Sequence, residues 1–566
     1  MPLVERDNEL GELQNAVAEA QSGHGTTLVI EGPPGIGKTA LLEAASEMAA
    51  HVGMLTASTR AVELESGWGF SAVRDLLAPV LASLGTNDRD TVLDGAARLA
   101  QGPLGLGAAP VDLGAAIHGC YWLCANLAER QPMMLTIDDA HWADEASLAF
   151  LAYLSRRVSE LPLLLCVTMR PAELEPAVRS LAALRSEAGD VLRPAPLSVD
   201  GVARVLENGL DESAEPKFSE ACAAASGGNP FLVMETLEAV RQQGVRPITD
   251  EAERIEHLRP ETLAPTILAR LARLGSQARS VARGTAILGP DADVRRVAAL
   301  TELSPAVVAE AIAGLRREGI LTTAERLEFV HPLIHTAVYA DVAEPDRGLG
   351  HLRAARILDQ DGDRSRVPSH LLVADRHGDA WVIDRLRKAA ETALSAGSPR
   401  SAAALLDRAL AEPAPEAQRA ALRVDLGRAL LRSGDATTAV SVLEQAVDEP
   451  GEATVRRSAV LELGRALRLA GQIPEAVAAF ENAIHALPPG HHEDEIELEL
   501  EIALASHMGM PASEWVDRLA SAATRASSMS LPERTLRSMY AYAAASTGIR
   551  TADEVARLAR SCIDPK

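Results

Sequence analysis

Eight residues near the start of the sequence constrain the fold of this chain more than any other feature: Gly32-Pro33-Pro34-Gly35-Ile36-Gly37-Lys38-Thr39. They fit the pattern G-x-x-x-x-G-K-[ST], a loop whose backbone N–H groups surround phosphate groups. The apolar run Thr27–Ile30 before the loop predicts a buried strand, and Ala40–Ala45 after it predicts a helix. This order predicts a nucleotide site at the edge of a parallel sheet, because the N-terminus of the helix attracts anions.

The loop residues have expected roles. The Lys38 ammonium group would reach the β- and γ-phosphates and assist catalysis, and the Thr39 hydroxyl group would hold Mg²⁺. We therefore expect ATP or ADP, with Mg²⁺, as ligands. The alternative is a glycine-rich turn without a ligand. The residues expected around the phosphates are Gly32, Pro33, Pro34, Gly35, Ile36, Gly37, Lys38 and Thr39.

Two further apolar runs end in polar residues. Met133–Ile137 is followed by Asp138 and Asp139, and Leu163–Thr168 is followed closely by Arg170. Ligands of such sheets lie at the carboxyl ends of the strands. We expect Asp138 to hold Mg²⁺, directly or through water, and Asp139 to orient or deprotonate the attacking water. Arg170 would sense the charge of the γ-phosphate. An Asx turn and a plain surface arginine are the alternatives.

The composition limits the class of protein. With 566 residues the chain is long enough for several domains, and its 47% of apolar residues can fill their cores. A net charge of −24 repels the DNA backbone and argues against a general nucleic-acid binder. The cysteines form no C-x-x-C pair, and Cys120 and Cys124 are interpreted as neighbouring core residues. Reduced thiols, no signal peptide and no membrane-length apolar run favour a cytoplasmic protein without membrane contact.

The order of the predicted elements separates the chain into an α/β part and a helical part. Strands at 27–30, 53–57, 133–137 and 163–168 alternate with helices, which predicts a parallel sheet. From about Ser198 onward the pattern is almost entirely helical. We predict an α/β nucleotide-binding core at 1–195, a helical lid at 196–255, a winged-helix domain at 256–345 and a helical repeat region at 346–566.

Three helices and a short β element predict the winged-helix domain. The helices are expected at 260–274, 277–288 and 306–317, and Ser304 and Pro305 should begin the last of them. A turn at 318–321 and a strand at Leu327–Val330 would complete the wing.

The last third of the sequence repeats itself with an offset of 37 residues. Leu426-Gly427-Arg428-Ala429-Leu430 recurs as Leu463-Gly464-Arg465-Ala466-Leu467. Helix pairs with a glycine turn and small packing residues are typical of tetratricopeptide repeats, which offer a surface for a partner protein. Chance similarity between Ala- and Leu-rich helices is the alternative. The acidic run at 493–501 is interpreted as a solvated face or a loop between repeats.

Several segments together resemble one protein family. Asp138-Asp139-Ala140-His141-Trp142-Ala143-Asp144 is similar to the D-D-x-H-W-A-D sequence of large ATP-binding LuxR-type regulators. These regulators are signal-transduction ATPases with numerous domains, related to AAA+ machines. The resemblance extends in order to about residue 410, and the other segments that carry it are Leu3–Leu10, Gly228–Leu232 and Phe329–Ile334.

The resemblance implies further roles. Val4 and Arg6 would line the adenine side of the site, and Pro230 would pack on the base. His331 would touch the β-phosphate of a resting, ADP-bound state; a buried structural histidine is the alternative. The resemblance also implies transcriptional regulation through a helix-turn-helix. The sequence contains no such motif, so we expect DNA contact only through a region outside this chain.

Two residues depart from the family pattern. Glu5 stands where a glycine is usual, which puts the adenine contact beside it in question. His335 stands where an arginine is common.

The preferred interpretation is a nucleotide-gated switch with slow ATP hydrolysis. Nucleotide would bias a closed form against an open form that self-associates, and the repeats would bind an inducer or a partner protein. One alternative is an ATP-driven remodelling motor, with Arg156 or Arg157 as an arginine finger. A scaffold with an inactive site is another. A third is direct DNA binding by the winged helix through Arg316 and Arg317.

Overall fold

The computed structural model describes residues 3–107, 110–171, 178–210, 212–256, 263–322, 326–413, 416–449, 452–487, 490–509, 512–525 and 530–563. The chain forms two compact units. The first comprises Met1–Asp375 with Ser395–Ser398, and the second comprises Arg376–Leu394 with Pro399–Lys566. The division into four domains stays a prediction.

Five of the described segments form a parallel sheet in the first unit, which confirms the predicted α/β core. The strand order is β2-β3-β4-β1-β5. β2 begins two residues later than predicted, because Gly53 turns the chain with a φ of 80°. β5 was not predicted, since its three residues are too short a pattern. The strands are β1 (Thr26–Glu31), β2 (Leu55–Arg60), β3 (Met133–Asp138), β4 (Leu163–Met169) and β5 (Asp190–Leu192).

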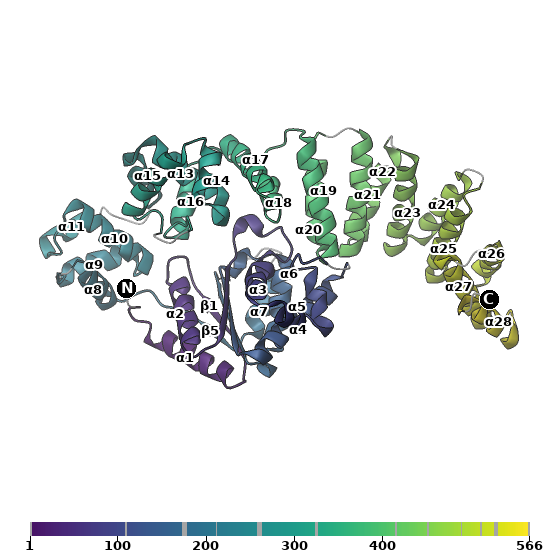
Figure 1. Cartoon of the computed structure of the whole chain (residues 1–566), viewed down its shortest axis with the longest axis horizontal. Helices are drawn as coiled ribbons and strands as arrows, with labels where there is room; N and C mark the ends of the chain where they lie inside the picture. Colours follow the sequence, from purple (N-terminus) through teal and green to yellow (C-terminus); the bar gives the residue numbers. More distant parts are fainter. Residues whose placement is uncertain are drawn as a thin grey trace. The chain divides into compact units, whose positions relative to one another are not determined.

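Helices cover both faces of this sheet, so the central strands are apolar on both sides. Leu28 and Ile30 of β1 pack with α1 and α2 on one face, whereas Val29 packs on the other with α3, α5, α6 and α7 (Figure 1). The helices are α1 (Asp7–Gln21), α2 (Lys38–His51), α3 (Ser71–Ser83), α4 (Thr86–Val92), α5 (Leu113–Arg130), α6 (Glu145–Ser155) and α7 (Val178–Glu187).

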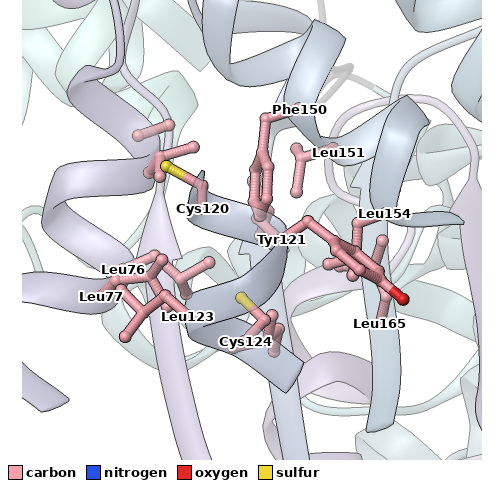
Figure 2. Packing of buried hydrophobic residues seen from close by; sticks show 14 of the residues in the cluster. Leu76, Leu77, Cys120, Tyr121, Leu123, Cys124, Phe150, Leu151, Leu154 and Leu165 are labelled. Atoms are coloured by element: carbon pink, nitrogen blue, oxygen red, sulfur yellow. The ribbon is translucent and has the colours of Figure 1, made fainter. Parts of the chain in front are cut away.

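The core on the second face contains two of the cysteines. Cys120 and Cys124 lie on α5, fully buried among leucines of α3 and α6 (Figure 2). Their interpretation as core residues is confirmed, and all five cysteines are free thiols. Burial raises the pKa of the Cys124 thiol to about 12, so it stays protonated and unreactive at neutral pH.

A helical region follows the sheet in the first unit. Ser304 caps α15 by accepting a hydrogen bond of 3.4 Å from the Val307 N–H group, as predicted. No single helix among the described residues is long and apolar enough to cross a membrane, and α14 with α15 meets that requirement only as a pair bent by 111°. The helices are α8 (Val199–Leu210), α9 (Pro216–Ser226), α10 (Pro230–Gln243), α11 (Ala252–Glu256), α12 (Leu263–Arg273), α13 (Gly275–Leu288), α14 (Val294–Thr301), α15 (Pro305–Arg317), α16 (Pro332–Ala340), α17 (Glu344–Gln360) and α18 (Val367–Val373).

The predicted wing is smaller than expected. The strand predicted at Leu327–Val330 is only partly confirmed: among the described residues one antiparallel bridge pairs Leu321 with Phe329. Hydrogen bonds flank it, from the Thr322 N–H group to the Glu328 carbonyl group at 2.8 Å and from the Val330 N–H group to the Ile320 carbonyl group at 3.1 Å. Residues 323–325 of the turn, and 260–262 of the first predicted helix, lie outside the described residues. The winged-helix assignment stays a prediction.

The second unit is a row of antiparallel helices (Figure 1), which confirms the predicted repeats. Gly427 lies against Leu443, and Gly464 lies against Phe480, so each glycine lets the following helix pack closely. A Cβ atom at Gly464 would lie 2.3 Å from the Phe480 ring. The helices are α19 (Ala380–Ser395), α20 (Pro399–Leu410), α21 (Glu416–Ser433), α22 (Ala436–Asp448), α23 (Ala453–Leu469), α24 (Ile473–His485), α25 (His492–Gly509), α26 (Ala512–Arg525), α27 (Leu531–Thr547) and α28 (Ala552–Ile563).

The acidic run at 493–501 was interpreted wrongly as a solvated face or loop. It lies in α25, and Glu499 and Glu501 are buried. Arg518 donates a hydrogen bond of 2.9 Å to Glu499, and Arg465 donates one of 2.7 Å to Glu501. Neighbouring helices therefore neutralise the two buried carboxylates, as buried charges require.

Candidate functional site

The phosphate loop joins β1 to α2, as the sequence predicts. Gly35 and Gly37 have φ angles of 83° and 101°, which side chains rarely adopt. α2 begins at Lys38, directly after the loop. The Lys38 ammonium group donates hydrogen bonds of 2.9 Å and 3.0 Å to the carbonyl groups of Gly32 and Pro33. Burial lowers the pKa of Lys38, while Asp139 and Asp138 oppose that shift.

The predicted lid element contacts the loop directly. Asn229 caps α10 and also donates a hydrogen bond of 3.0 Å to the Pro34 carbonyl group. The Phe231 N–H group donates one of 3.2 Å to the Gly35 carbonyl group. A Cβ atom at Gly35 would lie 2.7 Å from the Asn229 side chain, so the lid requires glycine here. Pro230 stands between these contacts, at the first position of α10.

The end of β3 lies beside the loop. Asp138 accepts hydrogen bonds of 2.9 Å from Thr39 and 2.6 Å from Thr168 of β4. The Asp139 N–H group donates one of 2.8 Å to the Thr168 hydroxyl group. Asp139 itself has a φ of 53°. The structure thus brings together the side chains expected to hold Mg²⁺, and a hydroxyl and a carboxylate suit that cation.

Sequence reasoning missed Arg60, at the end of β2. Its guanidinium group lies 3.1 Å from Oδ2 of Asp139 and 3.6 Å from Oδ2 of Asp138. Arg60 is the register partner of Asp138 across the β2–β3 pair. Because that pairing depends on the strand order, only a knowledge of the order could have found it.

Arg170 and His331 face the same cluster of charges. Arg170 follows β4 and lies close enough to lower the pKa of Lys38 and of His331. The His331 ring stacks on Phe231 with centroids 3.6 Å apart, and its Nδ1 accepts a hydrogen bond of 3.2 Å from the Leu333 N–H group. Burial, and then Arg60, lower the pKa of His331 to about 4, so the ring is neutral at pH 7.

Val4 and Arg6 connect the start of the chain to the helices after the sheet and to the phosphate loop. Val4 packs in the apolar cluster of α8, α9 and α10. Arg6 is buried and donates hydrogen bonds to the carbonyl groups of Glu5, Ile36 and Ala195. Arg6 therefore ties the start of the chain to the phosphate loop.

Glu5 adopts a glycine-like backbone, with a φ of 55°. Its carboxylate accepts hydrogen bonds from the N–H and hydroxyl groups of Ser198 at the start of α8. These hydrogen bonds lower its pKa. They hold Glu5 in a backbone conformation that side chains rarely adopt.

Asp144, at the end of the D-D-x-H-W-A-D sequence, has a structural position. Its buried carboxylate accepts hydrogen bonds from Ser147 in α6 and from Phe70, Ser71 and Ala72 at the start of α3. Asp144 therefore holds the N-termini of two helices together.

Comparisons with known proteins match both parts of the chain. Residues 2–167 match the family described as AAA ATPase domain, which implies nucleotide binding. Residues 387–450 and 424–491 match the tetratricopeptide repeat. The chain therefore combines an AAA ATPase domain with tetratricopeptide repeats. Assignment to the LuxR-type regulators stays a prediction.

Individual relatives are distant. An uncharacterized protein of Rhizobium meliloti is 25% identical over an alignment of 413 residues, and the match covers 63% of this chain but only 37% of that protein. A STAND protein with a tetratricopeptide repeat sensor from Pyrococcus horikoshii aligns over 99% of this chain and 82% of its own, with 14% identity and a TM-score of 0.44. The Aeropyrum pernix ORC1 protein, solved with DNA, aligns over 60% and 93%, with 15% identity and a TM-score of 0.30.

Proposed function

We propose that the first unit is a nucleotide-gated switch that binds ATP or ADP with Mg²⁺. One observation supports it most: Phe231 contacts the phosphate loop and the α16 segment at once. Its N–H group donates a hydrogen bond of 3.2 Å to the Gly35 carbonyl group, and its ring stacks on the His331 ring. A ligand that changes the loop would therefore act on both the lid and α16, which is the differential contact a switch needs.

The side chains have separate roles in this proposal. Lys38 would exchange its two carbonyl contacts for phosphate oxygens, and Thr39 with Asp138 would hold Mg²⁺, which screens the phosphate charge. Asp139 would orient the attacking water and Arg170 would sense the γ-phosphate. Hydrolysis is slow and resets the switch.

The residues proposed to contact the adenine base, and the residue proposed to contact ADP in a resting state, are inferred from the family resemblance. Val4 and Arg6 would border the adenine, Pro230 would pack on it, and His331 would contact the β-phosphate of ADP. Residues 1–195, 196–255 and 256–345 would act as core, lid and winged helix.

The second unit would report the nucleotide state. Its repeats would bind an inducer or a partner protein, and the open form would self-associate. The most specific part of the proposal is a role in transcriptional regulation, and such a role would need a DNA-binding region outside this chain.

Lys38→Ala tests nucleotide binding. We expect calorimetry to detect no ATP or ADP affinity in this variant, while Lys217→Ala, which changes an exposed lysine of α9, binds as the wild type does. Unchanged affinity in Lys38→Ala would refute the site.

Two measurements separate a switch from a motor. The switch predicts a change in oligomeric mass between ADP and a slowly hydrolysed ATP analogue, and turnover well below about one per second. Fast turnover without a change in mass would favour the remodelling motor.

A further inference from the structure

His141 is a largely buried histidine whose ring nitrogens have no hydrogen-bond partner among the described residues. It follows Asp139 in the short helical turn Ala140–Trp142, at the end of β3. Both ring nitrogens are buried, and neither bonds to any described residue of the chain. Nδ1 lies 3.9 Å from Oδ1 of Asp139, beyond hydrogen-bond distance.

Two other largely buried histidines of the first unit have partners. Nε2 of His335 lies 3.1 Å from the Ala286 carbonyl group, and Nε2 of His351 lies 2.8 Å from the Tyr339 hydroxyl group. A purely structural role for His141 would predict a similar partner. A buried polar group without a partner requires an explanation, and a ligand that supplies the missing partner is one.

The groups that face His141 are those placed around the phosphates. Asp139 and Arg170, directly after β3 and β4, and Lys38 at the start of α2 influence the pKa of His141. Burial is the largest effect and lowers the pKa of His141 to about 4. The ring is therefore neutral at pH 7 and offers one N–H donor and one acceptor.

An aromatic ring and a cation lie near the His141 ring. The Trp142 ring lies 5.1 Å from the His141 ring, between centroids, and Arg170 lies over the Trp142 ring at 6.0 Å. Trp142 therefore lies next to both His141 and Arg170.

We propose that the His141 ring donates a hydrogen bond to the terminal phosphate of ATP and so lets the site distinguish ATP from ADP. The inference rests on the proposed nucleotide site and adds the residue that reads the third phosphate. Lys38 reaches the β- and γ-phosphates in loops of this kind. His141 lies 3.9 Å from Asp139, the residue proposed to orient the water that attacks the γ-phosphate, so a donor here would face the end of the site where ATP and ADP differ. With ADP, the ring has no such acceptor.

The test compares two affinities. Calorimetry with Mg²⁺ measures a slowly hydrolysed ATP analogue and ADP on the full chain, for the wild type and for His141→Phe. The variant keeps a ring and removes both nitrogens. We expect it to lose roughly ten- to a hundredfold in affinity for the ATP analogue, the range for hydrogen bonds to charged groups. Its affinity for ADP should stay within about twofold.

His335→Phe is the matched control. It removes a buried imidazole that already has a partner, and it should leave the ratio of the two affinities unchanged. His141→Gln keeps an N–H donor and should restore most of the preference for the ATP analogue.

A second measurement needs no substitution. In ¹⁵N-histidine spectra of the wild type, the ATP analogue should shift the His141 nitrogen signals and ADP should not. The inference is overturned by an equal loss for both nucleotides, by no loss, or by equal spectral shifts. A wild type that binds neither nucleotide would instead refute the proposed function.

Discussion

The Thr39 hydroxyl group donates a hydrogen bond of 2.9 Å to Oδ2 of Asp138, although 99 residues separate the two in the sequence. Thr168 holds the other oxygen of the same carboxylate. Two strands and the start of α2 therefore fix the orientation of Asp138 before any cation binds, which is the preorganisation that a metal site requires.

Thr39→Val tests the Mg²⁺ site. Valine has nearly the same shape as threonine but lacks the hydroxyl group, so the loop should keep its fold and lose one oxygen ligand. We expect the gain in ATP affinity that Mg²⁺ gives the wild type to fall at least about tenfold, the usual effect of losing a group that holds a metal. Calorimetry with Mg²⁺ and with EDTA measures the gain. Thr56→Val, an exposed change on β2, is the control. A variant with the full Mg²⁺ effect would remove Thr39 from the site.

Arg60→Gln tests whether a cation of the protein competes with Mg²⁺. The variant lacks the guanidinium group that pairs with Asp138 and Asp139, so Mg²⁺ no longer competes with it for these carboxylates. The nucleotide-free protein should therefore bind Mg²⁺ roughly fivefold more tightly. That factor corresponds to about 1 kcal/mol, the upper range for a partly exposed ion pair. The Mg²⁺ affinity is measured from the melting temperature of each protein at increasing Mg²⁺ concentrations. Arg98→Gln, which breaks an exposed ion pair with Asp94, should change nothing. Weaker Mg²⁺ binding in Arg60→Gln would contradict this role.

The sequence predicts those parts of the site that lie in continuous segments. The phosphate loop, Asp138 and Arg170 follow apolar runs, and their common edge follows from a parallel sheet. Arg60 could not be found in this way, because its place beside Asp138 depends on β2 lying next to β3. His141 belongs to a recognisable segment, yet no pattern shows that its nitrogens lack partners.

In the second unit, too, the sequence predicts local features but not contacts between distant segments. The offset of 37 residues predicts the repeats, since each repeat carries its own glycine and its own packing residue. Burial of Glu499 and Glu501 could not be predicted, because an acidic run favours solvent unless its partners are known. Arg518 comes from the next helix and Arg465 from two helices earlier.

A buried charge cluster predicts a pH effect on stability. Arg366 lies 3.1 Å from Glu65, 2.7 Å from Asp75 and 3.4 Å from Asp291. Burial raises the pKa of Glu65 from 4.5 to about 7. Between these values the folded protein keeps a proton that the unfolded chain releases, so rising pH removes stability across this window.

Glu65→Gln measures this contribution. The glutamine is neutral at every pH, so the stability of the wild type relative to the variant should fall by about 2–3 kcal/mol from pH 4.5 to 7. Urea unfolding of both proteins at several pH values gives the difference. Glu63→Gln, two residues away and exposed, is the control for removing a carboxylate from this segment. A rising or flat difference for Glu65→Gln would contradict the direction of the pKa shift.

Gly464→Ala tests whether the close approach of helices defines the repeat. Alanine favours a helix over glycine by about 1 kcal/mol. At this position, however, the new Cβ atom would meet the fully buried Phe480 ring at 2.3 Å. Overpacking of about 1–3 kcal/mol should outweigh the gain, so the variant loses stability. Hydrogen exchange should accelerate in α23 and α24, because these helices contain the two residues. Gly11→Ala, in α1 with no atom within 4 Å of the added Cβ, provides the matched comparison and should gain stability. If both variants gained stability, Gly464 would be in its place for a reason other than contact with Phe480.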